Sequence, residues 1–526
     1  MASRGWRRFA LLVVAGMVAG TSIAPWFVLP ALFVSFPVWV WCLDGAERQS
    51  GWRALFGSAF GIGFAFGWGY FTVAFHWLGA AFFVDGGVMI ALMPFAILAL
   101  AAIIAFFWGL ASALAHLLWS RGVWRIVTLA TFLTMAEWAR GHVLTGFPFD
   151  LLGYALTPSD EMMQITSVIG VYGLTLVAAL LAMLPALVWP ANGRRLLRRV
   201  VPVLVGIVVL AGQWGYGAYR LASTATVERT DIALRLVQPV VREHADWGNA
   251  DPATLIDKLL MLSEMRTGPA DEGLADITHV VWPESSLPFF LSSYPDALPR
   301  MAAMLPETTM LLAGAPRQQI LPGATQASGP PFNALLAIDS YGEIVAAYDK
   351  SHLVPFGEFL PFSGFFSQFG IKQFVPGAEG WAHGDAGRRL MSLPATPSFL
   401  ALICYEILFS GDLGDTANAG FILNITNDAW FDGSIGPAQH AHHARVRAVE
   451  EGLSLIRAAN TGLTFATDPL GRITAQIAPQ EMAVLDVRPQ ERLAGTVFAS
   501  LRYWPLLCAL ALGLAISLWA ARRRVR

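Results

Sequence analysis

Cysteine and charged residues are both scarce in this 526-residue sequence. The three cysteines, Cys42, Cys404 and Cys508, are too few for a disulfide framework and too far apart for a zinc cluster, so at least one thiol is free. Charged residues make up 14% of the chain, against about 25% in soluble domains, which excludes a set of three ordinary soluble domains. The net charge of −2 gives no general case for nucleic-acid binding.

Lysine is the rarer of the two strongly basic residues. The 35 basic residues include only three lysines, Lys258, Lys350 and Lys372, and the rest are arginine. Such a bias reflects coding preference more than physics. Each lysine is nevertheless of interest, because an ammonium group shifts its pKa far more readily than a guanidinium group and can therefore carry protons.

Long apolar runs are abundant in the first 220 residues and recur near the C-terminus. A membrane-spanning helix needs about 20 largely apolar residues. The run at 9–43 is long enough for a tight pair of spans. The other runs lie at residues 54–84, 86–120, 126–146, 162–189, 200–219 and 504–521. We predict an α-helical membrane bundle of eight spans, seven within residues 1–220 and one within residues 501–526, which end in a basic tail.

Arginine is distributed unevenly among the connections between these runs. With the N-terminus inside, fifteen arginines fall in five predicted cytoplasmic segments, whereas the outer loops near residues 79–86 and 140–161 hold only Arg140. Cytoplasmic loops of membrane proteins carry such an excess of positive charge. We expect both termini in the cytoplasm and the region between spans seven and eight outside. The alternative for the first run is a cleaved signal peptide, but no clear cleavage site is followed by soluble sequence.

Residues 221–500 have ordinary charge density and short strand-like runs. Helices are predicted at 253–266 and 437–459, and hairpin turns at 340–342 and 468–471. Strands are predicted at 232–237, 277–282, 310–315, 333–339, 344–348, 399–404, 421–426 and 463–467. Strands interleaved with helices indicate an α/β sandwich domain.

Three chemically competent side chains follow predicted strands in this domain: Glu284, Lys350 and Cys404. Strand ends are where α/β folds expose their working groups. Taken singly, each has an ordinary alternative, namely a solvated or capping glutamate, a surface lysine and an inert core cysteine. Together, and in this order, they match the Glu-Lys-Cys arrangement of the nitrilase superfamily.

The sequence around these residues resembles one branch of that superfamily, the membrane-bound apolipoprotein N-acyltransferases. The resemblance covers nearly the whole chain. It is carried by Trp-Pro-Glu-Ser at 282–285, Tyr-Asp-Lys at 348–350, His-Leu-Val-Pro-Phe-Gly-Glu at 352–358, Cys-Tyr-Glu at 404–406, Asn-Ile-Thr-Asn-Asp-Ala-Trp-Phe at 424–431, Glu-Trp-Ala-Arg-Gly at 137–141 and Leu-Thr-Gly-Phe-Pro at 144–148. It implies that the α/β domain is a nitrilase-like αββα sandwich.

The resemblance also implies roles for individual residues. A thiol attacks only as thiolate and needs a base or a cation beside it. Glu284 would be the general base, Lys350 the cation that stabilises thiolate and oxyanion, and Cys404 the nucleophile. Glu358 matches the family's additional essential glutamate, which would orient Lys350 or the amine. Tyr405 and Glu406 match supporting positions beside the nucleophile, although Glu406 could instead pair with a neighbouring arginine.

The implied reaction is a ping-pong acyl transfer that needs no metal and no diffusible cofactor. Cys404 would take the sn-1 acyl chain of a phospholipid, typically phosphatidylethanolamine, as a thioester. The N-terminal amine of an S-diacylglyceryl-cysteine apolipoprotein would then accept the chain, as the last step of bacterial lipoprotein maturation. The implied location is the cytoplasmic (inner) membrane, with the catalytic domain facing the periplasm.

An aromatic segment at residues 355–376 is expected to contact the lipid. Phe356, Phe359 and Phe362 lie in this segment, which glycine and proline interrupt, and it is typical of an amphipathic lid, with an ordinary aromatic core as the alternative. Trp247 resembles a family tryptophan implicated in substrate access.

Charged residues of the membrane part and a histidine cluster of the outer part are expected to be structural. Glu137 and Arg140 are three apart on a predicted helix and are expected to form a buried ion pair, with contact to a lipid headgroup as the functional alternative. His440, His442 and His443 suggest a metal site, but adjacent helical positions point in different directions and no acidic partner is evident.

Two other functions remain open from the sequence. A membrane-tethered amidase or nitrilase would use the same triad with water as acceptor. A transporter or scaffold would use the outer domain only to bind a ligand, although ionisable residues within the spans are too few to line an ion pathway.

Overall fold

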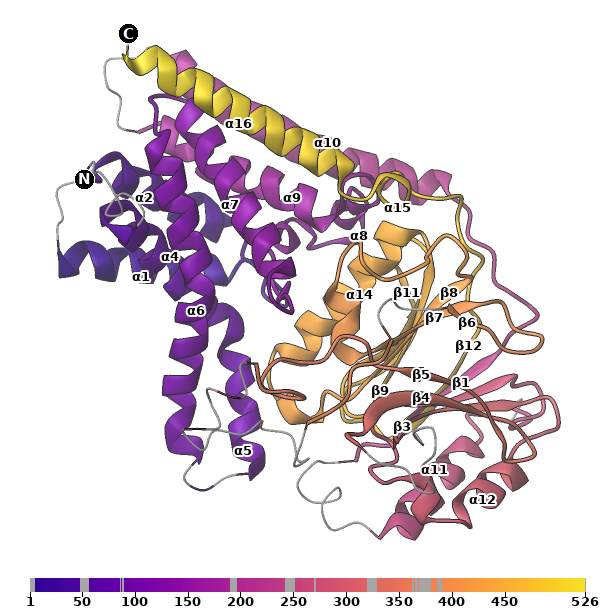
Figure 1. The fold of residues 1–526 in the computed structure, drawn as a ribbon. Helices are drawn as coiled ribbons and strands as arrows, with labels where there is room; N and C mark the ends of the chain where they lie inside the picture. The colour runs from indigo at the N-terminus through magenta and orange to yellow at the C-terminus, as the bar shows by residue number, and fades with distance from the viewer. Residues whose placement is uncertain are drawn as a thin grey trace. The chain divides into compact units, whose positions relative to one another are not determined.

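The computed structural model describes residues 5–47, 56–85, 87, 89–189, 196–241, 251–268, 271–318, 329–361, 364, 368, 380–385 and 390–525 (Figure 1). The chain divides into two compact units. Unit 1 comprises Met1–Thr224, Gly433–His442 and Thr496–Arg526, and unit 2 comprises Ala225–Asp432 and His443–Gly495.

Unit 1 is helical. Its helices are α1 (Trp6–Gly20), α2 (Pro30–Asp44), α4 (Ser58–Phe75), α5 (Ala81–Asp85), α6 (Met89–Leu117), α7 (Trp124–His142), α8 (Asp160–Met163), α9 (Thr166–Met183), α10 (Leu196–Ser223), α15 (Val497–Leu501) and α16 (Trp504–Val525). It also includes the start of α14 (Gly436–Glu451), which continues into unit 2.

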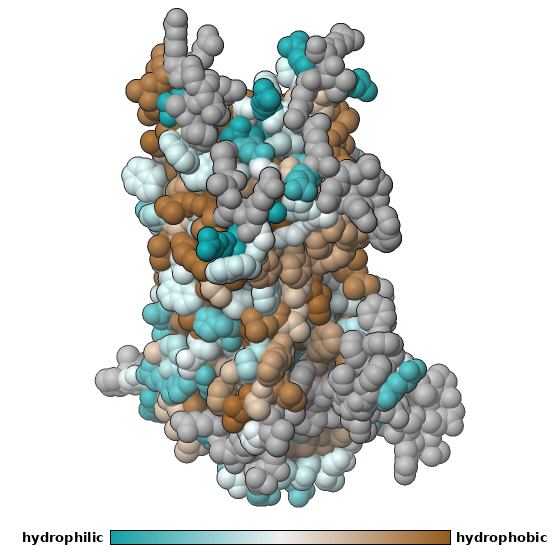
Figure 2. Space-filling view, turned by 90° about the vertical axis from the view of Figure 1, so that its left-hand side faces the viewer, coloured by the Kyte–Doolittle hydropathy of each residue, from teal (hydrophilic) through white to brown (hydrophobic). Residues whose placement is uncertain are grey.

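Five stretches among the described residues are long and apolar enough to cross a membrane: Ser58–Val84, Ile90–Leu117, Thr166–Leu187, Arg199–Ser223 and Trp504–Arg523. Large apolar side chains are exposed along these helices, for example Phe95 at 70% and Ile103 at 61%. The face drawn in Figure 2 likewise carries extended hydrophobic areas. Apolar surface of this extent indicates a membrane protein. The count of eight spans stays a prediction.

Small residues allow close helix packing in unit 1. A Cβ atom added at Gly16 of α1 would overlap the carbonyl oxygen of Phe66 in α4, and one added at Gly69 of α4 would overlap that of Val13 in α1. Membrane helices associate through such small-residue contacts, because lipid supplies no hydrophobic drive between them.

The predicted ion pair between Glu137 and Arg140 is confirmed and lies buried in α7. Arg140 Nη2 is 2.7 Å from Glu137 Oε2, and Trp108 Nε1 donates to Glu137 Oε1 at 2.8 Å. Arg140 Nη1 also donates to the carbonyl oxygens of Phe147 and Phe149, at 2.7 and 2.8 Å. The pair therefore fixes the chain that follows α7 as well as neutralising two buried charges.

Unit 2 contains two six-stranded sheets. The first sheet has the order β12-β1-β2-β3-β4-β5 and the second the order β11-β10-β9-β8-β7-β6. The strands of the first sheet are β1 (Leu234–Gln238), β2 (His279–Trp282), β3 (Met310–Arg317), β4 (Phe332–Ile338), β5 (Ile344–Asp349) and β12 (Ala483–Val487). Those of the second are β6 (Leu390–Met391), β7 (Phe399–Ile403), β8 (Phe421–Thr426), β9 (Ser454–Ala459), β10 (Thr464–Thr467) and β11 (Ile473–Ile477).

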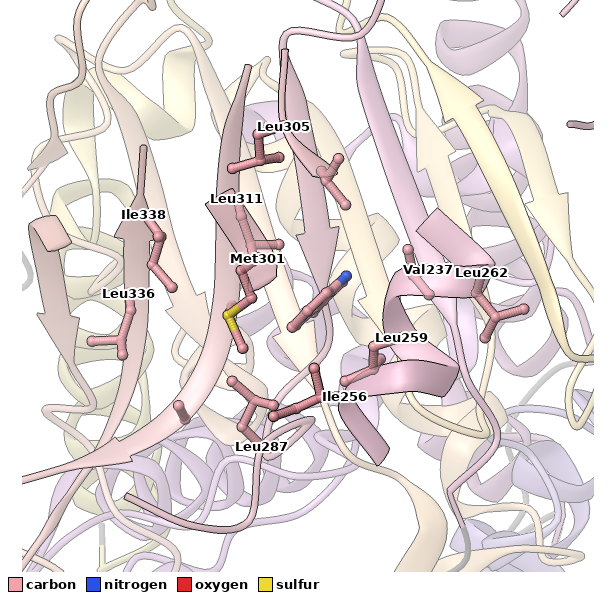
Figure 3. Packing of buried hydrophobic residues seen from close by; sticks show 14 of the residues in the cluster. Val237, Ile256, Leu259, Leu262, Leu287, Met301, Leu305, Leu311, Leu336 and Ile338 are labelled. Carbon is pink, nitrogen blue, oxygen red and sulfur yellow. The ribbon is translucent and has the colours of Figure 1, made fainter. Parts of the chain in front are cut away.

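Alternating side chains of the strands build two separate cores. One face of the first sheet packs against helices α11 (Pro252–Ser263) and α12 (Ala297–Met304), and Figure 3 shows Leu259 and Met301 among the side chains that meet there. The opposite face shares a second core with the second sheet, to which Leu312 and Leu423 contribute. Because strand residues alternate between faces, strands β1, β2, β3, β4 and β12 of the first sheet supply both cores.

Most predicted elements of unit 2 are present, and one is wrong in part. All eight predicted strands are found within a few residues of their expected limits, and both predicted hairpin turns join antiparallel strands. The helix predicted to run to residue 459 instead ends at Glu451. Gly452 has a φ of 67° and ends it, and β9 follows. Residues Ser454–Ala459 thus form a fully buried strand, which periodicity alone does not distinguish from a helix.

His279 generates a prediction about pH and stability. Its ring lies buried between the hydroxyl groups of Thr278 and Thr396, at 2.8 and 3.0 Å, and burial lowers its pKa to about 4. The unfolded chain, with a pKa near 6.5, therefore takes up the proton first, so stability falls as the pH drops from about 6.5 to 4, by up to ~3 kcal/mol.

We expect His279→Asn to weaken this dependence in thermal unfolding of the full-length protein in detergent between pH 4.5 and 7.5. His383→Asn, at an exposed histidine, is the matched control and should leave the dependence unchanged. Equal acid sensitivity of wild type and His279→Asn would contradict the prediction.

Candidate active site

Strand ends bring the predicted acid and cation of unit 2 into contact. Glu284 lies two residues after β2 and Lys350 directly after β5, and both side chains are buried. Lys350 Nζ is 3.2 Å from Glu284 Oε1 and 2.9 Å from Glu358 Oε1. The ammonium group thus lies between two carboxylates.

Two asparagines and one valine complete the hydrogen bonding of these carboxylates. Asn333 Nδ2, at the start of β4, donates to Glu284 Oε1 at 2.8 Å and to Glu358 Oε1 at 3.0 Å. The backbone N–H of Asn427 donates to Glu284 Oε2 at 2.8 Å, and that of Val354 to Glu358 Oε2 at 2.8 Å. All four carboxylate oxygens therefore accept a hydrogen bond, as buried charges require.

The sequence did not identify Asn333 as a site residue. It is the first residue of a strand that was predicted from its apolar residues. Its role depends on the side chains of Glu284 and Glu358, which are distant in sequence. A buried amide in an otherwise apolar strand is the only local signal. Asn427 lies within one of the family motifs, but its contribution is a backbone N–H, which any residue except proline could supply.

Cys404 directly follows β7 and has a φ of 52°, in the left-handed region. Non-glycine residues rarely adopt this conformation, and it is often found where a side chain must be aimed at a reaction centre. Burial raises the pKa of the Cys404 thiol, and the nearby Glu284 carboxylate raises it further, whereas the Lys350 cation opposes the rise. The resting sulfur is therefore a neutral thiol that must lose its proton to react.

Lys350 remains charged in this environment. Burial alone would lower the pKa of its ammonium group, but the carboxylates of Glu284 and Glu358 outweigh that effect and raise the pKa well above its usual value. A permanent cation beside a neutral thiol can stabilise negative charge that develops on sulfur or on an adjacent oxygen.

Glu406 connects the lysine-bearing and cysteine-bearing segments. Its carboxylate is fully buried and accepts hydrogen bonds from the N–H groups of Ser351, His352 and Ile403, at 2.9, 3.1 and 2.8 Å. The Tyr348 hydroxyl also donates to it, at 2.9 Å. Glu406 thus positions the chain after β5 against the turn after β7.

Of the other site residues predicted from the sequence, some lie within the described structure and some lie outside it. Tyr405 is buried, and its ring packs edge-on against Phe409 with centroids 5.3 Å apart. Phe356 and Phe359 are half-buried on either side of Glu358, and the Phe356 N–H donates to the Phe359 carbonyl at 2.8 Å. Trp247, Phe362 and most of the predicted lid lie outside the described residues.

The histidines considered for a metal site contact other groups. His440 and His442 belong to unit 1, where His442 Nε2 is 2.7 Å from the Thr157 hydroxyl. Within the described part of the chain, no group of three or more histidine, cysteine, aspartate or glutamate residues is arranged to hold a metal ion. The cation beside Cys404 is Lys350.

The geometry around Asn333 generates a prediction. Asn333→Asp keeps the side-chain shape but replaces the shared donor with a third carboxylate, facing Glu284 and Glu358. Breaking charge-assisted hydrogen bonds and adding like charge should cost about 1–3 kcal/mol of stability at pH 8. The loss should shrink at pH 5, where a carboxylate in such a cluster takes up a proton.

Thermal unfolding of the full-length protein at both pH values measures this effect. Gln476→Glu, which introduces a carboxylate at an exposed position of β11, supplies the matched control and should change stability by less than about 0.5 kcal/mol. An Asn333→Asp variant as stable as wild type at pH 8 would show that the amide does not hold the carboxylates.

Two family profiles cover most of the chain. The apolipoprotein N-acyltransferase N-terminal domain matches residues 15–184, and the carbon-nitrogen hydrolase domain matches residues 236–494. The second match and the two sheets establish unit 2 as a nitrilase-like α/β domain. Among solved structures, an amidase of the nitrilase superfamily from Nesterenkonia is 15% identical, with a TM-score of 0.36 over 54% of this chain and 98% of that one.

Full-length relatives are also similar to the chain. An apolipoprotein N-acyltransferase of Rhodopseudomonas palustris is 40% identical over 99% of this chain and 96% of its own length. That of Bradyrhizobium diazoefficiens is 39% identical over 99% of this chain and 96% of its own length. With this identity from end to end, the chain belongs to the apolipoprotein N-acyltransferase family.

Proposed function

We propose that this protein transfers the sn-1 acyl chain of a phospholipid, through a thioester on Cys404, to the N-terminal amine of S-diacylglyceryl-cysteine apolipoproteins. Membership of the family supports lipoprotein N-acylation. The observation that carries the finer mechanism is the Lys350 ammonium held between Glu284 and Glu358, close enough to Cys404 to oppose the rise in its thiol pKa.

The first half-reaction loads the enzyme. The Cys404 thiol gives its proton to Glu284, and the sulfur attacks the ester carbonyl carbon. Lys350 stabilises the oxyanion of the tetrahedral intermediate. When the carbon–oxygen bond breaks, the lysophospholipid oxygen takes the proton from Glu284, and the acyl chain remains on sulfur as a thioester.

The second half-reaction transfers the acyl chain from Cys404 to the acceptor amine. The α-amino group of the apolipoprotein attacks the thioester carbonyl, Glu284 accepts a proton from the amine, and the sulfur leaves and is reprotonated. An amide forms and the thiol is restored, so no metal or cofactor takes part. Glu358 and Glu406 act as positioning residues, since the first holds Lys350 and the second aligns the two active segments.

Membrane attachment is required by the substrates. Both keep acyl chains in the bilayer, and withdrawing a chain costs about 0.8 kcal/mol for each CH₂ group.

We propose three domains, with a membrane domain at residues 1–220, an extracytoplasmic catalytic domain at 221–500 and a final span with a basic tail at 501–526. Eight spans would then place the catalytic domain in the periplasm and both termini in the cytoplasm. Phosphatidylethanolamine is the proposed acyl donor.

The acyl-enzyme gives the decisive test of the mechanism. Intact mass spectrometry of the full-length protein with a phospholipid donor should show one acyl increment, absent from Cys404→Ala. Loss of the base in Glu284→Gln should slow its formation by about 10²–10⁴-fold, and Lys350→Met should slow it as well. Cys42→Ala, which removes a buried thiol of α2, is the control and should load normally.

The acceptor distinguishes transfer from hydrolysis. A lipopeptide with a free N-terminal amine should discharge the acyl-enzyme much faster than buffer does. Rapid discharge by water alone would favour the amidase or nitrilase alternative. Normal lipoprotein maturation by Cys404→Ser, without preferential alkylation of Cys404, would favour a transporter or scaffold.

The proposed topology has its own test. In a background with all three native cysteines replaced, Tyr341→Cys lies on an exposed hairpin of unit 2 and Arg522→Cys near the end of α16. A membrane-impermeant maleimide applied to intact spheroplasts should label the first variant and should label the second only after lysis. Labelling of Arg522→Cys in intact spheroplasts would contradict a cytoplasmic C-terminus.

A further inference from the structure

A buried threonine hydroxyl lies beside the sulfur of Cys404. Strands β7 and β8 are parallel neighbours, and Ile403 pairs with Ile425, so the residues that follow, Cys404 and Thr426, lie next to each other at the same sheet edge. Thr426 is fully buried, and its side chain lies close enough to Cys404 for hydrogen bonding between them to lower the pKa of the thiol. The same hydroxyl is 3.3 Å from Asp428 Oδ1. It thus has two acceptors within reach.

Asp428 is held in place by a buried cation. Its Oδ2 is 2.9 Å from Nη2 of Arg457, and both side chains are almost fully buried. Arg457 also hydrogen-bonds to Asn424 Oδ1, and Asn424 Nδ2 donates to the carbonyl oxygen of Leu402 at 3.1 Å. The backbone of Gly462 packs so closely on the carboxylate that a Cβ atom there would collide with it. The acceptor for the threonine hydroxyl is therefore fixed, while the hydroxyl itself can rotate.

The charges around the sulfur of Cys404 leave its thiolate form in need of a hydrogen-bond donor. Glu284 from the end of β2 and Asp428 from the end of β8 disfavour the thiolate, and Lys350 from the end of β5 favours it. Burial, which has the largest effect on the pKa of the thiol, and the excess of negative over positive charge together keep the resting thiol neutral. A neutral hydroxyl adds no charge to this balance but can stabilise the thiolate once that has formed.

We propose that Thr426 is a further catalytic residue, whose hydroxyl donates to Asp428 in the resting enzyme and turns to donate to the Cys404 sulfur when the thiolate forms. The thiol proton goes to Glu284, and the threonine O–H bond stays intact, so only a hydrogen bond changes its acceptor. Asp428 and Arg457 are positioning residues for the hydroxyl. The inference rests on the proposed function, in which Cys404 is the nucleophile.

The test is the pH dependence of Cys404 alkylation by iodoacetamide in the full-length protein, resolved by peptide mass spectrometry between pH 6 and 10.5. Thr426→Val keeps the shape and removes the donor. It should react about tenfold more slowly at pH 8, with its midpoint moved to higher pH. Thr426→Ser, which keeps the hydroxyl, should stay within about twofold of wild type.

Two further variants separate this role from packing. Thr467→Val removes a buried hydroxyl at the opposite end of the same sheet and should react like wild type. Asp428→Asn removes a negative charge that faces the sulfur, so its midpoint should move to lower pH, opposite to that of Thr426→Val.

The outcomes distinguish the inference from the function on which it rests. A wild-type protein whose Cys404 shows no pH-dependent alkylation would overturn the nucleophile itself. A normal wild-type profile shared by Thr426→Val would overturn only the role of the hydroxyl. Equal slowing of Thr426→Val and Thr426→Ser, or a midpoint of Asp428→Asn above that of wild type, would likewise overturn it.

Discussion

A buried ammonium group is the constraint on which the site of unit 2 depends. Removing the Lys350 charge from water costs several kcal/mol even after relaxation, and only well-placed opposite charges offset that cost. Glu284 and Glu358 supply those charges from two different chain segments. Their own oxygens then need donors, which Asn333, Asn427 and Val354 provide. The demand for a satisfied cation thereby fixes the ends of several strands relative to one another.

The same cluster explains how a thiol can be kept inert and yet be ready to react. Burial and, to a smaller extent, the negative charge of Glu284 hold the proton on Cys404, and the cation lowers the free energy of the charged states that follow. A thiolate present at all times would be open to oxidation and to unwanted electrophiles. A neutral thiol with a base close by forms the nucleophile only when a substrate carbonyl is in place.

Much of this arrangement could be predicted from the sequence. Apolar runs of four to eight residues indicated the strands, and Glu284, Lys350 and Cys404 could be selected because each follows one of them and because the surrounding motifs resemble those of the family.

Other features could not be predicted from the sequence, for physical reasons. Asn333 and Thr426 act through contacts with segments far away in sequence, and those contacts follow from strand register rather than from local pattern. The helix predicted through residue 459 was too long, because a fully buried strand such as β9 has no alternation to reveal it. The ion pair of Glu137 and Arg140 could be predicted because the two residues are one helical turn apart.

The carboxylate of Glu406 has a consequence for how members of this family can vary. It accepts hydrogen bonds from Ser351 and His352 on one side and from Ile403 on the other, so the two active segments are joined directly rather than through the long stretch of chain between them. Insertions or deletions in that intervening stretch need not disturb the spacing of lysine and cysteine. The length of that stretch can therefore change during evolution while the chemistry stays the same.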